Sequence, residues 1–213
     1  MPDRTWYLVR HGQTEWNAEK RMQGQWDSRL SELGRKHADD NGRWLATLGI
    51  EHAWASPLGR VRETVAIVNK HFPIEPVWDD RLKEWSSGDW SGELYADIQE
   101  KRVAEWEAWD ADRYNVRPPN GENFHDLAAR ASSFLADSRA HPARTVAVFA
   151  HGFILRNLAA CLLDLTPQDV LDIRQTNDVV FRITEGDGGT QAHHFIAGAG
   201  PHEDLPRGEQ RVA

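Results

Sequence analysis

The chain has 213 residues, of which 40% are hydrophobic and 27% are charged, and its formal net charge at pH 7 is −8. These values fit one ordinary globular domain and argue against general binding to nucleic acid or to anionic membranes, which depends on basic surfaces. No apolar run approaches the roughly 20 residues needed to span a bilayer, and a lone cysteine, Cys161, leaves no partner for an internal disulfide or a cysteine-based zinc site.

The first part of the chain alternates short apolar runs with amphipathic segments. Residues 5–9 predict a buried strand, and Ser31 is a suitable N-cap for a helix that Gly49 would end. Residues 52–55 predict a second short strand, after which Ser56 is expected to cap another helix, with the proline that follows in its first turn. The apolar faces of these two helices are expected to comprise Leu33, His37, Trp44, Leu45 and Leu48, and then Val61, Val65 and Val68.

The remainder of the chain continues this alternation around one insertion. The expected elements are a short strand at 74–78, an amphipathic helix from Phe124, a strand at 145–150, a helix at 153–163 and a hairpin of 179–184 with 191–196. Tryptophans, charges and a Pro-Pro-Asn-Gly segment indicate a helical cap insertion at about 88–123. We therefore expect a single domain over residues 1–197 and a flexible tail over residues 198–213.

Strands that alternate with helices are typical of an α/β protein, and we predict a three-layer α/β/α sandwich with a mostly parallel central sheet. In such sheets, ligands bind beyond the carboxyl ends of the strands. Arg10 and His11 end the first strand, and Arg60 follows the second. His151 directly follows the strand at 145–150. These polar groups are therefore expected to converge on one crevice.

The residue types at these strand ends suit phosphoryl transfer. Neutral histidine is a nucleophile, and its ordinary pKa of about 6.5 leaves much of it neutral near pH 7. Arg10 and Arg60 provide permanently charged planar forks that match phosphate oxygens, and His151 adds a further donor. A helix that begins at Gly152 would point free backbone N–H groups at the same anion. Taken singly, His11 or His151 could instead be a hydrogen-bonded core residue.

Phosphoryl transfer from an ester also needs an acid for the leaving oxygen. Glu84 lies in the segment RLKEWSSGDWSG, just after the predicted strand at 74–78. A carboxyl group beside Trp85 in a partly dry cleft is suited to donate a proton there. Glu93 and Glu122 are the alternative donors.

Six segments in this order resemble the histidine phosphatase superfamily, also called phosphoglycerate-mutase-like. They are LVRHGQTEWN, RMQGQWDSRLSELG, SPLGRVRET, RLKEWSSGDWSG, PPNGENF and VFAHGFILR, and the resemblance extends over about residues 5–197. It implies that His11 is the phosphohistidine nucleophile and that Glu84 first donates a proton and later activates water. The residues that the resemblance places around the phosphate are Arg10, Asn17, Gln23, Gly24, Arg60 and His151. It requires no metal and no other cofactor.

The acceptor of the phosphoryl group distinguishes phosphatases from mutases in this family. Mutases carry an arginine directly after the acid–base glutamate and a pair of adjacent arginines in a longer insertion. Here Glu84 is followed by Trp85, and the insertion has no such pair. The sequence is more similar to the broad-specificity phosphatases, although Asn123 stands where those usually have Ser or Arg. We expect a phosphomonoesterase that hydrolyses small-molecule esters, with mutase-type transfer as the alternative.

Aromatic residues in and before the insertion bear on the leaving group. They are Trp85, Trp90, Trp106, Trp109 and Tyr114. As a stacking wall over the cleft, with Trp85 in contact with substrate, they would favour an apolar, aromatic or sugar leaving group over a small carboxylate. Packing within the insertion is the alternative, and the helical spacing of Trp106 and Trp109 favours a core or partner-facing position for those two.

The expected partner is therefore a small-molecule phosphate ester, with no nucleic acid and no membrane. An exposed sheet edge or tryptophan face would also suit a homodimer. The N-terminal stretch lacks the pattern of a secretory signal peptide, so we expect a cytoplasmic protein. A non-catalytic module that only binds phosphorylated ligands is a further alternative, but the presence of both histidines and both arginines argues against it.

Overall fold

The computed structural model describes residues 3–208 of the chain. Its strands are β1 (Arg4–Arg10), β2 (His52–Ala55), β3 (Val77–Trp78), β4 (Thr145–Ala150), β5 (Val179–Gly186), β6 (Gly189–Ile196) and β7 (Ala199–Glu203). Its helices are α1 (Glu15–Ala18), α2 (Glu32–Leu45), α3 (Gly59–Val68), α4 (Tyr95–Lys101), α5 (Val103–Ala111), α6 (Phe124–Ser138), α7 (Gly152–Leu163) and α8 (Pro167–Asp172), with 3₁₀ turns at Asp80–Leu82 and Gly88–Trp90. Within these residues, none of the helices combines the length and the apolar character that a membrane crossing requires.

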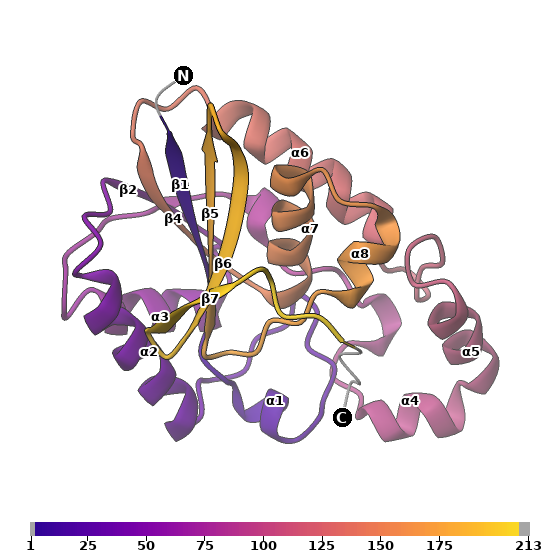
Figure 1. Ribbon diagram of the computed structural model, residues 1–213. Coiled ribbons are helices and arrows are strands. Elements are labelled where there is room, and N and C mark those ends of the chain that lie inside the picture. Colours follow the sequence, from indigo (N-terminus) through magenta and orange to yellow (C-terminus); the bar gives the residue numbers. More distant parts are fainter. Residues whose placement is uncertain (1–2, 209–213) are drawn as a thin grey trace.

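The seven strands form one sheet in the order β3-β2-β4-β1-β5-β6-β7 (Figure 1). The first four run parallel to one another, whereas β5, β6 and β7 extend the sheet as an antiparallel edge. Arg10 pairs with Ala150, and Ala55 pairs with Phe149, so β1, β4 and β2 end at the same level. The residues that follow these three strands therefore share one edge of the sheet.

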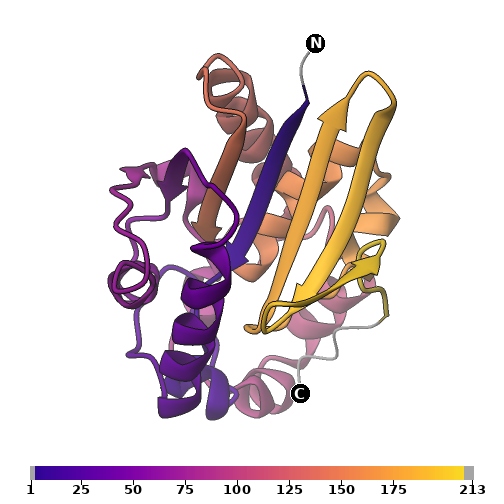
Figure 2. The ribbon, with the colours of Figure 1, turned by 60° about the vertical axis from the view of Figure 1, so that its left-hand side comes forward.

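Helices cover both faces of the sheet (Figure 2). Alternate side chains of a strand point to opposite faces. Trp6 and Leu8 of β1 accordingly join a buried core with residues of α6 and α7, whereas Tyr7 and Val9 join a second core with residues of α2 and α3. The predicted three-layer α/β/α sandwich, parallel in its central part, is confirmed.

Two helices beside the site differ in how they begin. Ser31 caps α2 through its side chain, as predicted. Ser56 does not cap α3, which begins at Gly59, so that prediction was wrong. The carboxylate of Asp27, from an earlier loop, caps the helix instead. It accepts the backbone N–H groups of Gly59 and Arg60 at 2.7 and 3.2 Å. Ser56 is thereby left free for a different contact.

Three further predictions need correction. Residues 199–203 of the expected flexible tail form β7 and pair with β6, while residues 209–213 lie outside the described residues. β3 covers only the last two residues of the strand expected at 74–78. Leu33 is 48% exposed and Gly34 faces the core instead, because α2 packs so closely that a Cβ on Gly34 would lie 1.9 Å from the carbonyl oxygen of Gln13.

Residues 88–123 form the predicted cap of short helices, and its aromatic residues pack mainly against one another. Trp90 and Trp109 are fully buried, and Trp106 packs on both. Trp85 stacks on Trp109 with 5.5 Å between ring centroids. The core position of Trp109 is confirmed, and the stacking wall is not formed as a whole, since Trp85 lines the adjacent cavity but Trp90, Trp106 and Trp109 do not.

Candidate active site

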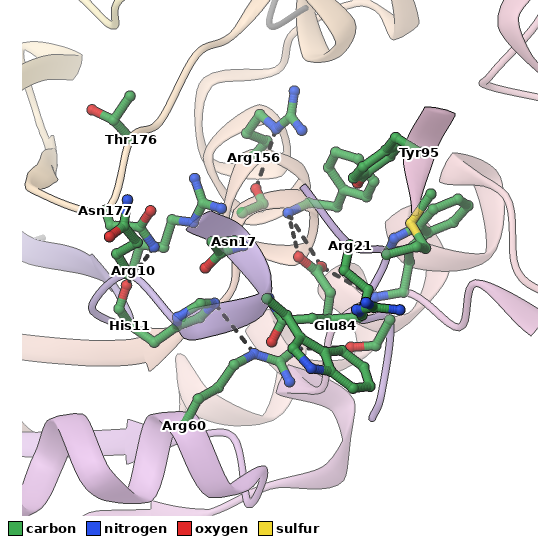
Figure 3. A pocket seen from close by; sticks show the side chains of 18 of the residues that line it. Arg10, His11, Asn17, Arg21, Arg60, Glu84, Tyr95, Arg156, Thr176 and Asn177 are labelled. Atoms are coloured by element: carbon green, nitrogen blue, oxygen red, sulfur yellow. Dashed lines mark hydrogen bonds between the residues drawn. The ribbon is translucent and has the colours of Figure 1, made fainter. Parts of the chain in front are cut away.

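The ends of β1, β2 and β4 converge on one cavity of about 280 Å³ (Figure 3). The predicted site residues that line it are Arg10, His11, Asn17, Gln23, Gly24, Arg60, Glu84, Trp85 and Gly152. His151 is fully buried directly behind this lining, with its ring centroid 5.1 Å from that of His11. The fold therefore brings together the residues that the resemblance assigns to the phosphate site, together with Glu84, Trp85 and Gly152.

The imidazole of His11 is only 3% exposed and is held in one orientation. Its Nδ1 lies 2.7 Å from the carbonyl oxygen of Gly12, an acceptor, so Nδ1 carries the ring proton. Its Nε2 accepts the Nε–H of Arg60 at 3.3 Å. Both contacts assign the tautomer with a lone pair on Nε2, the atom that faces the cavity.

Arg60 shares one N–H between the two histidines of the site. The distance from its Nε is 3.3 Å to Nε2 of His11 and 3.1 Å to Nδ1 of His151. Because Nδ1 of His151 accepts the N–H of Arg60, the ring proton of His151 lies on Nε2, which is 2.8 Å from Oγ of Ser56. Asp27 holds the far end of the guanidinium through Nη1 at 3.1 Å. Ser56 is thus a positioning residue that sequence analysis assigned to helix capping.

Both histidines are neutral at pH 7. Burial lowers the pKa of His11 well below its ordinary value of 6.5, and the charges of Arg60 and Arg10 lower it further. The pKa of His151 is also well below 6.5, first because of burial and then because of Arg60. Neutral imidazole is the form that can attack an electrophile. The electrostatic environment and the hydrogen bonds therefore agree on the state of His11.

The loop between α8 and β5 orients the end of β1. Arg10 donates through Nη1 to the carbonyl oxygen of Gln175, and Asn177 donates to the carbonyl oxygen of His11 at 2.8 Å. A Cβ on Gly152 would lie 3.3 Å from the guanidinium carbon of Arg10, so glycine permits their close approach. Sequence analysis missed Gln175 and Asn177. The available signal was a polar run directly before a strand, which reaches the site because β5 is antiparallel to β1.

The carboxylate of Glu84 lies at the N-terminus of α7. It accepts the backbone N–H groups of Phe153 at 3.2 Å and of Ile154 at 3.3 Å. These are N–H groups that we predicted would face a phosphate, and that prediction is corrected because they bind the carboxylate of Glu84. A carboxylate is favourable at this position because the helix N-terminus carries partial positive charge.

The alternative proton donors are engaged elsewhere. Glu93 pairs with Arg102 at 2.7 Å, and Glu122 pairs with Arg130 at 3.0 Å. Neither of them lines the cavity, whereas Glu84 does.

Within residues 3–208, the His, Cys, Asp and Glu side chains form no group of three or more that could hold a metal ion.

Asn17 and Gln23 are both oriented by Thr14. Oδ1 of Asn17 accepts the backbone N–H of Thr14 at 3.0 Å, and Nε2 of Gln23 donates to the Thr14 hydroxyl at 2.7 Å. Gly24 follows with φ at +51°, and a Cβ there would lie 2.3 Å from Oγ of Ser87. Glycine is therefore required for this turn to pass beside the cavity.

Sequence analysis missed most of the charge in the cavity. Five further cations line it, namely Lys20, Arg21, Arg113, Arg156 and Arg174. Together with Arg10 and Arg60 they face a single lining carboxylate, that of Glu84, among the described residues. The cavity is thus strongly positive although the chain carries a net charge of −8. Figure 3 shows Arg156 at the end of the cavity away from Arg60.

Tyr95 is the first residue of α4 and lines the cavity from the cap. Burial raises the pKa of its hydroxyl to about 12, and the negative charge of Glu84 contributes to this rise. The phenol is therefore neutral at pH 7 and is available as a hydrogen-bond donor. The cap thus contributes a neutral donor to the cavity.

Comparison with known proteins agrees with this geometry. Residues 6–197 match the model of the histidine phosphatase superfamily (branch 1). A protein named "Probable phosphoglycerate mutase GpmB" from Enterobacter sp. (strain 638) is 34% identical over 214 residues, covering 94% of this chain and 95% of that protein. The mycobacterial glucosyl-3-phosphoglycerate phosphatase, in a complex with VO3, is 30% identical with a TM-score of 0.80 and covers 92% of this chain and 100% of its own.

Alpha-ribazole phosphatase from Shigella flexneri shares the fold, with a TM-score of 0.84 at 21% identity over 94% of this chain and 100% of its own. The family match covers nearly the whole chain and includes every strand end that forms the cavity. The chain belongs to the histidine phosphatase superfamily and is an enzyme that acts on phosphate esters.

Proposed function

We propose that the protein is a phosphomonoesterase that hydrolyses small-molecule phosphate esters through a phosphohistidine on His11. The observation that carries the proposal is the orientation of that ring. Its Nδ1 is committed to the Gly12 carbonyl oxygen, so the lone pair of Nε2 is presented to a cavity that also contains Arg10 and the carboxyl group of Glu84. A nucleophile, fixed positive charge and an acid are the three requirements of the reaction.

In the first step, Nε2 of His11 attacks phosphorus. The N–P bond forms, the bond from phosphorus to the ester oxygen breaks, and Glu84 gives its proton to the departing oxygen. In the second step, Glu84 takes a proton from a water molecule while the water oxygen attacks phosphorus. The N–P bond then breaks, which releases inorganic phosphate and returns both residues to their starting state.

The shared N–H of Arg60 fits this sequence of steps. It must leave the lone pair of His11 as phosphorus approaches, and a buried N–H without an acceptor is costly. His151 offers the second acceptor at 3.1 Å, so the N–H stays hydrogen-bonded while His11 is phosphorylated. Ser56 holds that acceptor in place from the other side of the ring. We assign His151 and Ser56 this positioning role.

Mutase-type transfer is the second candidate, because the curated relatives are named as phosphoglycerate mutases. A mutase must return the phosphoryl group to a bound sugar acid in preference to water. The residue after Glu84 is Trp85, which is 2% exposed and packs on Trp109. That position therefore supplies no cation for the carboxylate of a sugar acid, and we favour water as the acceptor.

The test measures phosphate release from a panel of alkyl, aryl and sugar phosphates, with isomerisation of 3-phosphoglycerate assayed in parallel. Release from several esters without isomerisation is expected, as is a base-stable phosphohistidine that can be trapped during turnover. Isomerisation without release would reject hydrolysis in favour of the mutase. Release that proceeds without any phosphohistidine in the trapped enzyme would reject the mechanism.

A further inference from the structure

Five cations that line the cavity, here called the outer cations, are not used by the proposed hydrolysis: Lys20, Arg21, Arg113, Arg156 and Arg174. Arg21, Arg60 and Arg113 each have a carboxylate partner, in Glu19, Asp27 and Asp110 respectively. Arg10 belongs to the proposed phosphate site. The lining cations that remain, with no ion pair to another described residue, are Lys20, Arg156 and Arg174.

Arg156 is the most informative of these, because it is 3% exposed. Its Nε donates to the carbonyl oxygen of Gly152 at 3.2 Å, and its Nη1 donates to that of Ile173 at 3.1 Å. The ring of Phe153 lies 4.5 Å from the guanidinium carbon. All of these partners are neutral, and no described residue accepts a hydrogen bond from Nη2. Burial lowers the pKa of Arg156 to about 9, so it remains charged at pH 7.

A buried charge is costly unless an opposite charge or a ligand compensates it. Of the lining cations without a carboxylate partner, Lys20 and Arg174 are exposed and are compensated by solvent, and Arg10 belongs to the proposed phosphate site. Arg156 is buried and has only neutral partners. An ester with an uncharged leaving group would leave the charge of Arg156 without a compensating anion.

We propose, building on the proposed phosphomonoesterase activity, that Arg156 and Arg174 form a second anion subsite for a carboxylate or second phosphate on the leaving group. A guanidinium fork suits either group. Figure 3 shows Arg156 apart from the phosphate end at His11 and Arg60, as a subsite for the other end of the substrate requires. Arg174 lines the same cavity from the loop before β5 and is exposed, with its side chain free of ion pairs to other described residues.

The second anion subsite favours a charged leaving group, whereas the tryptophans in the sequence suggest an uncharged one. Trp90 and Trp109 are buried in the cap and do not line the cavity, so the aromatic wall that would favour an uncharged leaving group is incomplete. Trp85 is the member of that group which reaches the cavity, and Trp16, Tyr95, Phe124 and Phe153 line it as well. The seven lining cations favour a leaving group that carries negative charge.

The experiment compares matched esters that differ in one group. Glycerol 3-phosphate is the neutral member, 3-phosphoglycerate adds a carboxylate, and glycerol 1,3-bisphosphate adds a second phosphate. The measured quantity is kcat/KM for phosphate release, and each ratio to the neutral ester reports discrimination. We expect at least one ratio to be about tenfold or more, the size of one charge-assisted hydrogen bond. The higher ratio identifies whether the subsite prefers carboxylate or phosphate.

Substitutions then locate the subsite. Arg174→Gln and Arg156→Met should each lower the discrimination ratio by about tenfold, and Arg156→Lys should recover part of it. Arg29→Gln is the matched control, because Arg29 is exposed, lies outside the cavity and has no side-chain partner among the described residues. It should leave the ratio unchanged. If Arg156→Met does not fold, the ratio of Arg174→Gln decides.

The possible results separate this proposal from the proposed function. Hydrolysis of all three esters with equal kcat/KM would overturn the second subsite and leave the phosphomonoesterase intact. A preference for the anionic esters that neither Arg156→Met nor Arg174→Gln reduces would also overturn it. Failure to release phosphate from any ester, including aryl phosphates, would overturn the proposed function itself.

Discussion

The two ends of the cavity are built in different ways. At the phosphate end, His11, Arg60 and His151 stand at strand ends or at the start of a helix and are joined by one shared N–H. At the cap end, Tyr95 begins a seven-residue helix and Arg113 follows a nine-residue one. Hydrogen bonds among these side chains and to the neighbouring loops fix the first group, whereas the second group depends on how the short helices of the cap pack.

This difference predicts that substitutions at the two ends should affect activity and stability separately. The sheet carries the phosphate end, so its groups can change the chemistry with little effect on folding. The cap end is supported by a cluster of buried tryptophans, so substitutions there should lower the stability of the protein more than its activity. Substitutions at the two ends are therefore the most direct way to test whether the cavity has these two parts.

The largest effect is expected from His11→Ala. Removal of the proposed nucleophile should lower kcat by at least about 10⁴-fold, since the covalent route is lost while the pocket remains. The circular dichroism spectrum and the unfolding midpoint in urea should stay close to those of the wild type. His125→Ala is the control, because His125 is exposed and outside the cavity. Substantial residual turnover in a clean preparation would reject His11 as the nucleophile.

The opposite pattern is expected from Trp109→Ala. Trp109 is 1% exposed and stacks on Trp85, so its loss leaves a large hole in the cap. The free energy of unfolding should fall by about 3–5 kcal/mol. Turnover of the folded protein should fall far less than in His11→Ala, because Trp109 does not line the cavity. Trp78→Ala, at a 38% exposed tryptophan, should cost much less stability. Equal losses at both positions would contradict a separately packed cap.

A smaller kinetic effect is expected from Glu84→Gln. Glutamine keeps the shape but cannot supply a proton, so kcat/KM for alkyl phosphates, which reports the steps up to phosphorylation of His11, should fall about a hundredfold to a thousandfold. Aryl phosphates, whose leaving groups need less protonation, should lose much less. Glu122→Gln tests the alternative donor and should leave this dependence on the leaving group as in the wild type, since Glu122 pairs with Arg130 away from the cavity. The reverse result would move the acid to Glu122.

The phosphate end is also the part that the sequence predicts best. The strand at 145–150 is found with those bounds, and Arg10, His11 and Arg60 reach one cavity as expected. Each of these positions follows from a local pattern, a strand with a polar group at its end, combined with the general rule that parallel strands end together. No knowledge of side-chain packing is needed for that inference.

The remaining features depend on contacts between distant segments. Asp27 caps α3 from 32 residues away in sequence, and Gln175 holds Arg10 across 165 residues. No local pattern identifies such partners. The outer cations are a similar case, because an arginine such as Arg156 within an apolar helix shows its role only when distant segments, such as that of Ile173, pack around it. The leaving-group side was therefore the part that sequence analysis could not predict.

The smallest expected effect concerns pH and stability. The pKa values of His11 and His151 in the folded protein lie well below their ordinary value of 6.5. Between those lowered values and pH 6.5, the unfolded chain binds more protons than the folded one. The stabilisation is therefore fully present above pH 6.5 and is lost as the pH falls below it. Each histidine should contribute a slope of about 1.4 kcal/mol per pH unit in that window.

Urea unfolding at pH 7.5, 6.5 and 5.5 measures this slope, and His11→Asn isolates one of its sources. Other histidines with lowered pKa values, such as His37 and His52, contribute equally to the wild type and the variant and so cancel in the difference. The variant should lose stability less steeply on acidification, by about one histidine's contribution. If the free energy of unfolding depended on pH in the same way in the wild type and in His11→Asn, His11 would gain no proton on unfolding in this pH range. That result would contradict a neutral ring fixed by burial and by Arg60, on which the contrast between the two ends of the cavity depends.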